Sequence, residues 1–186
     1  MIDAVRFRIF VGLLCGFCLL FGVFSAAAQN TGSKTVSVNL PAVALLDIEP
    51  NNAGISLSFS APSEAGMPVT SPTANTSKWL NYTSALASLA PARHVSAAID
   101  GVIPGVSIRV QAGPAVGGGG GALGTSTGAV TVTTVPQAIV SGIGGAFTGD
   151  GANNGHQLSI WAEISDYNVV TRITGQIVTI TYTISN

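Results

Sequence analysis

The chain has 186 residues, with 7 lysines and arginines against 8 aspartates and glutamates, and charged residues make up only 8% of it. Nucleic-acid binding needs clustered basic side chains to neutralise phosphates, so a net charge of −1 with so few charges excludes that class. Hydrophobic residues make up 47% of the chain, which excludes charge-driven disorder. The length predicts one domain behind a processed leader.

The first 28 residues have the layout of a secretory signal peptide. Arg6 and Arg8 give a positive start, residues 9–24 form an uncharged apolar core, and the small residues 25–28 suit a signal peptidase. A retained membrane helix needs roughly 20 apolar residues, and this core is shorter, so we expect cleavage after Ala28. The sequence therefore predicts export by the general secretory route, to the periplasm, the cell surface or the medium, with no membrane span after cleavage.

Both cysteines of the chain, Cys15 and Cys18, lie inside this leader. The exported domain, residues 29–186, is therefore expected to have no disulfide, and only its core and strand ladders would hold it together. Export without disulfides is more typical of a bacterial envelope protein than of a eukaryotic secreted one.

Period-two alternation dominates the chain after the leader, in short runs rich in Val, Ile and Thr and bounded by Gly, Pro and Asn. In chain order the predicted strands are 35–40, 43–48, 55–59, 79–86, 94–99, 106–110, 129–135, 138–143, 157–165 and 176–185. No segment has the period of an amphipathic helix. We predict an all-β domain, a single immunoglobulin-like antiparallel β-sandwich of about 8–10 strands. Residues 61–76 and the glycine-rich stretch 113–128 are expected to be loops, the second of them mobile.

Two patterns look like known sites, and each has a simpler interpretation. Residues 124–128 match G-x-S-x-G, but a Thr/Val strand follows where a nucleophile elbow needs a helix, so we interpret them as a turn. Residues 149–155 look like a calcium loop, but Ala152 stands where an oxygen ligand is needed, and a Gly/Asn hairpin turn explains the same residues. Whether Asp150 to Gly155 binds a cation stays open.

The two histidines, His94 and His156, stand alone in the sequence, and His156 is expected to be exposed beside its turn. A zinc site needs three or four ligands at suitable spacing, and the domain offers no cysteine. We therefore predict no catalytic residue, no metal ligand and no cofactor, and a chain that is not an enzyme.

Aromatic side chains give a second hypothesis. In the strand predicted over 157–165, Leu158, Ile160 and Ala162 alternate with Trp161 and Glu163, which places this Trp and this carboxylate on the opposite face. An exposed Trp beside a carboxylate can stack on a sugar ring. The alternative is that another part of the domain covers Trp161.

Two alternating stretches resemble the exported β-sandwich subunits of bacterial surfaces, the chaperone–usher pilins and spore-coat-U-like proteins. They are Val36-x-Val38-x-Leu40 and the closing Val178-x-Ile180-x-Tyr182-x-Ile184, and with the leader they cover about a third of the chain. In that family an N-terminal extension completes a neighbour's sandwich by strand addition. The resemblance implies that residues 29–40, with Val36, Val38 and Leu40 as the strand-exchange residues, act as a donor or an edge strand, in cis or in trans.

The function predicted from the sequence is therefore that of an exported, non-enzymatic cell-surface structural protein, a pilin-like subunit or an adhesin acting through strand pairing. Its partners would be itself or other envelope subunits, with no nucleic acid. The alternative is a secreted carbohydrate- or ligand-binding module that binds surface glycans through Trp161 and Glu163.

Overall fold

The computed structural model describes residues 31–186, so the predicted signal peptide with Cys15 and Cys18 lies outside the described residues. The chain divides into two units, Met1–Asn39 and Leu40–Asn186. In the first unit, residues 31–39 form no strand and no helix. No helix of a length and apolarity able to cross a membrane occurs in the described residues.

The second unit is all-β, as predicted. Its strands within residues 31–186 are β1 (Val43–Glu49), β2 (Asn75–Ala85), β3 (Arg93–Ile99), β4 (Val106–Val116), β5 (Gly120–Ser126), β6 (Val130–Thr131), β7 (Gln137–Phe147), β8 (Gly155–Ile164) and β9 (Ile180–Ser185). They form one antiparallel sheet of nine strands, which agrees with the number expected. The immunoglobulin-like topology stays a prediction.

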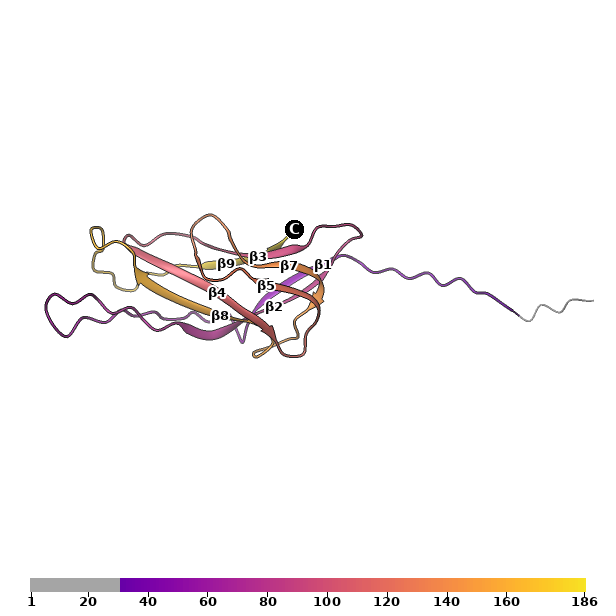
Figure 1. Ribbon diagram of the computed structural model, residues 1–186, viewed down its shortest axis with the longest axis horizontal. Helices are drawn as coiled ribbons and strands as arrows, with labels where there is room; N and C mark the ends of the chain where they lie inside the picture. Colours follow the sequence, from indigo (N-terminus) through magenta and orange to yellow (C-terminus); the bar gives the residue numbers. More distant parts are fainter. Residues whose placement is uncertain (1–30) are drawn as a thin grey trace, which may run out of the picture. The chain divides into compact units, whose positions relative to one another are not determined.

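The sheet follows the order β6-β4-β8-β2-β7-β3-β9, with β1 added to β2 and β5 added to β7. Figure 1 shows β4 and β8 side by side. Strand β2 pairs with β1 and β8 over most of its length but with β7 only at Thr83 and Ser84. This narrow junction divides the ladder into one half around β2, β4 and β8 and another around β3, β5 and β7. The arrangement is consistent with a β-sandwich.

Buried aliphatic side chains from both halves form the core. Along β4 and β8 they alternate with exposed or partly buried residues, as the sequence pattern predicts, whereas Ile139 and Val140 of β7 are consecutive and both buried. The fully buried large members are Leu80, Val95, Val110, Ile139, Val140, Ile143 and Leu158. In β9, Ile180, Tyr182 and Ile184 are half-buried while Thr181 and Thr183 are exposed, so the predicted alternation of the closing strand is confirmed.

The glycine-rich stretch 113–128 was expected to be a loop, and that prediction is wrong for most of it. Residues 113–116 end β4 and residues 120–126 form β5, with a tight turn between them. The reason is the close approach of β5 to β7, where a Cβ on Gly124 would lie 2.6 Å from the carbonyl oxygen of Ser141. Gly124 also has a φ of 73°, which favours glycine.

Candidate functional site

The predicted strand 35–40 is not part of the sheet. Residues 31–42 form no strand, and the apolar side chains of Val36, Val38 and Leu40 are 76%, 83% and 84% exposed. A strand needs a partner for its N–H and C=O groups, so an alternating sequence alone does not make one. The segment therefore has the residue pattern of a strand without being one in this chain.

A second predicted strand, 55–59, also forms no ladder, but it has a place in the second unit. Ile55 and Leu57 are partly buried against the core, and only Ser60, just beyond, makes an isolated bridge, to Thr70. Residues 173–178 are likewise without strand structure, although 176–185 was predicted as one strand. The observed strand β9 begins only at Ile180.

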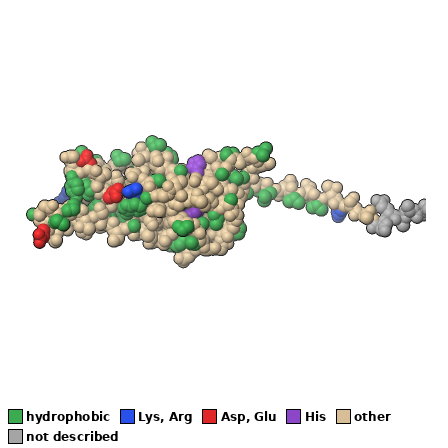
Figure 2. Space-filling view, viewed as in Figure 1, with side chains coloured by type: hydrophobic (Ala, Val, Ile, Leu, Met, Phe, Trp, Pro, Cys, Tyr) green, Lys and Arg blue, Asp and Glu red, His purple; other side chains and the backbone are tan. Residues whose placement is uncertain are grey.

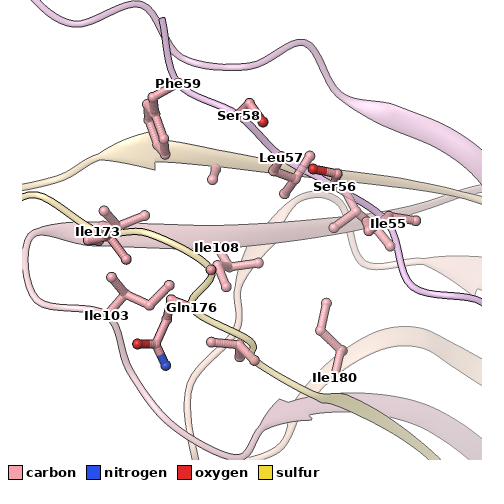
Figure 3. Close-up of a pocket in the computed structure, with 15 residues that line it drawn as sticks. Ile55, Ser56, Leu57, Ser58, Phe59, Ile103, Ile108, Ile173, Gln176 and Ile180 are labelled. Carbon is pink, nitrogen blue, oxygen red and sulfur yellow. The ribbon is translucent and has the colours of Figure 1, made fainter.

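These two segments border an apolar groove with a volume of about 480 Å³. Figure 3 shows Leu57 and Phe59 on one side, Ile173, Gln176 and Ile180 on the other, and Ile108 of β4 between them. The other apolar lining residues are Ile55, Ile103, Val106, Ile160, Ala162 and Val178. No Lys, Arg, Asp or Glu lines the groove.

The backbone beside this groove is unpaired. Within residues 31–186, segments 55–59 and 173–178 make no backbone–backbone hydrogen bond. Extended chain whose N–H and C=O groups lack partners can act as the edge of a sheet and accept a further strand. An apolar groove with such backbone on two sides has the geometry of a place in a sheet from which one strand is missing.

The outer face of β8 carries the two residues predicted for ligand binding, and the structure does bring Trp161 and Glu163 together there. Their neighbour on β4 is Arg109, the register partner of Trp161. The Arg109 guanidinium carbon lies 5.4 Å from the Trp161 ring centroid, and its Nη1 lies 3.6 Å from Oε1 of Glu163. A sugar stacking on this side of the ring would have to displace Arg109. Figure 2 shows how few charged side chains the visible face carries.

A buried polar pair between β2 and β8 had no signal in the sequence. His156 is fully buried, so the expectation that it is exposed is wrong. Its Nδ1 lies 2.7 Å from the carbonyl oxygen of Gly113, which can only accept, so Nδ1 carries the proton. Its Nε2 lies 2.9 Å from Tyr82 Oη, and the same hydroxyl contacts the carbonyl oxygen of Leu123 on β5, so the single proton of Tyr82 faces two acceptors. Burial raises the pKa of Tyr82 to about 12.

This pair joins the two halves of the sheet. Apart from each other, the two side chains bond to backbone carbonyls, and among the described residues no carboxylate and no Ser or Thr hydroxyl bonds to His156. Its geometry is that of a structural link. The other histidine, His94, lies 3.2 Å from the Ser185 hydroxyl on the neighbouring strand.

Neither motif-like stretch is a hairpin turn, because the strands on either side of it do not pair with each other. Residues 149–155 lead from β7, which pairs with β2, β3 and β5, to β8, which pairs with β2 and β4. Positive φ at Gly149, Gly151, Asn153 and Gly155 confirms the predicted turn, while the prediction of a hairpin is wrong. The Asn154 side chain accepts from Gly118 N and donates to the Asp150 carbonyl, so it ties this turn to the β4–β5 turn. In the G-x-S-x-G stretch, Ser126 ends β5 and no helix follows.

Comparison with known proteins adds no relative: no family model, no curated protein and no solved structure matches the chain. The pilin-like resemblance therefore rests on the residues quoted for it.

Proposed function

We propose that this chain is an exported, non-enzymatic structural subunit of the bacterial cell surface that assembles by strand addition. Residues 35–40 of one copy enter the apolar groove of the next copy and complete its sheet. The observation that carries the proposal is the alternating segment itself, whose three apolar side chains are more than three-quarters exposed outside any strand.

The donor segment and the groove match in chemistry. On an extended chain Val36, Val38 and Leu40 point to one side and Ser37 and Asn39 to the other, so one face is apolar and one polar. Neither residues 35–40 nor the groove carries a charged side chain, so no charge is buried on docking. Burying three aliphatic side chains contributes about 5–9 kcal/mol before the cost of ordering the segment.

Chain length supports addition between copies over insertion into the same copy. Val43 is paired with Ala85 at one end of β2, while Ile160, which lines the groove, is paired with Asn75 at the other end. These ten steps along β2 span roughly 33 Å. Leu40 precedes Val43 by three residues, which reach about 11 Å at most. Leu40 therefore cannot reach the groove of its own copy.

The test is electrophoresis in SDS, with and without boiling, of a cell-surface shear fraction probed for this protein. We expect a heat-sensitive ladder, because strand-exchanged subunits separate only when their sheets unfold. Val38→Asp removes the ladder, since it places a charge in the groove. Ser37→Asp, one residue away on the polar face, is the matched control and keeps it.

A mixing experiment separates donor from acceptor. The Val38→Asp protein has a defective donor and an intact groove, while a Leu57→Gln protein has an intact donor and an altered groove. Each alone should stay monomeric, and the mixture should form dimers but no longer species. Monomers in the unaltered protein under all these conditions would refute strand addition.

A further inference from the structure

One buried arginine hydrogen-bonds to three chain segments where the N-terminal segment joins the sheet. Arg93, the first residue of β3, is only 9% exposed. Its Nη1 donates to the carbonyl of Val43 and, at 3.1 Å, to Oγ of Ser84, and its Nε donates at 2.9 Å to Oδ1 of Asn186. A single guanidinium thus bonds the first residue of β1, the end of β2 and the residue that follows β9.

Among residues 31–186 no acidic side chain pairs with the charge of this arginine. All three acceptors are neutral, and the ion pair found among residues 31–186 is the distant Arg109–Glu163 contact. A cation taken out of water is retained only where hydrogen bonds compensate it. The planar fork of arginine can reach three acceptors in different directions, which the single ammonium of a lysine cannot do in the same way.

The hydrogen bond from Arg93 to the Val43 carbonyl lies where tension on the donor segment would first reach the sheet. Strand β1 pairs with β2 alone in the ladder, with seven residues in register starting at Val43. Leu40 is three residues before Val43, so tension on residues 35–40 reaches the Val43 end of β1 first. A strand pulled from its end opens one rung at a time, and the first rung determines whether opening begins.

We propose that Arg93 is a mechanical lock that keeps β1 from peeling off β2 when the donor segment is held by a neighbouring copy. The role of Arg93 under tension rests on the proposed strand addition. The lock itself is a property of the monomer, so it can be measured where no polymer is present.

Hydrogen exchange of the monomeric protein tests the lock. In Arg93→Lys we expect amide exchange in the first half of β1 to rise about 10-fold to 100-fold, the effect of losing a charge-assisted hydrogen bond, while β4 and β8 keep their protection. Ser84→Ala removes a single acceptor and should give a smaller, equally local rise if the first variant folds poorly. Arg172→Met, an exposed arginine outside the strands, is the control.

A uniform rise of amide exchange in every strand would mean a general loss of stability and would refute the proposed lock. Unchanged exchange in β1 would refute it as well. The role of Arg93 under tension is tested with the heat-sensitive ladder of polymers, which should dissociate at a lower temperature in Arg93→Lys. An unchanged dissociation temperature, together with a local rise in exchange in β1, would refute that role. Absence of any ladder in the unaltered protein would instead refute strand addition, and the exchange result would still decide the lock.

Discussion

The buried link between Tyr82 and His156 allows a quantitative test of what joins the two halves of the sheet. Tyr82 is 3% exposed, and Tyr82→Phe removes the hydroxyl that contacts the Leu123 carbonyl and His156 Nε2. His156 Nε2 would then be buried without a hydrogen bond, and the partly buried Leu123 carbonyl would lose a contact. An orphaned buried group costs about 1–3 kcal/mol, so we expect a loss of about 1–3 kcal/mol in the free energy of unfolding. For a domain of this size that lowers Tm by roughly 3–12 °C.

The chain contains a matched control. The Tyr182 hydroxyl is also buried, but it has no hydrogen-bond partner among the described residues. Tyr182→Phe removes the same atom and leaves nothing orphaned, so it should leave the stability unchanged or raise it. Urea unfolding of both variants, followed by tryptophan fluorescence, measures the difference. Equal effects of the two substitutions would refute the reasoning, because burial alone would then explain the cost.

Three further predictions concern stability. The free energy of unfolding should fall as the pH rises from about 10 toward about 12, because burial raises the folded pKa of Tyr82 to about 12 from 10.0 and also raises the pKa of Tyr182. Urea midpoints across this range measure the fall, and a fall that Tyr82→Phe leaves unaltered would contradict the prediction. Gly124→Ala should lower the free energy of unfolding by more than about 2 kcal/mol and Gly128→Ala by about 1 kcal/mol, because both glycines have positive φ but only Gly124 has close neighbours. Thermal unfolding measures both losses, and equal losses would count against the close approach of β5 to β7. A double-mutant cycle of Arg109→Met and Trp161→Phe should give a coupling of about 0.5–1 kcal/mol, and no coupling would mean that the stacking contributes nothing.

Alternation of apolar and polar residues predicted most of the strands whose partners lie in this chain. β1 and β3 were predicted to within a residue at each end, because their short runs are bounded by proline or glycine and one face is buried. The same pattern in residues 35–40 and 55–59 produced no ladder. Alternation indicates that a segment can pair, and a second strand must be present before it does.

The sequence could not predict the features that depend on distant residues. β5 was missed because a run of glycines is normally read as a loop, and its strand conformation depends on the equally glycine-rich β7 lying against it. The Tyr82–His156 link joins residues 74 positions apart, and neither has a local pattern that names the other. Trp161 and Glu163 were placed correctly on one face, but Arg109 comes from another strand.

The position of β2 in the sheet has a consequence for the time course of folding. This strand pairs with β1, which precedes it in the chain, and with β8, which comes much later in the chain, so its second edge stays open until nearly the whole chain is available. Contacts of such sequence separation place folding in the range of milliseconds to seconds. During that interval the open edge of β2 and the alternating segment of another copy are exposed together. If copies assemble by strand addition, as proposed, the period before the sheet closes is when premature pairing between them has to be prevented.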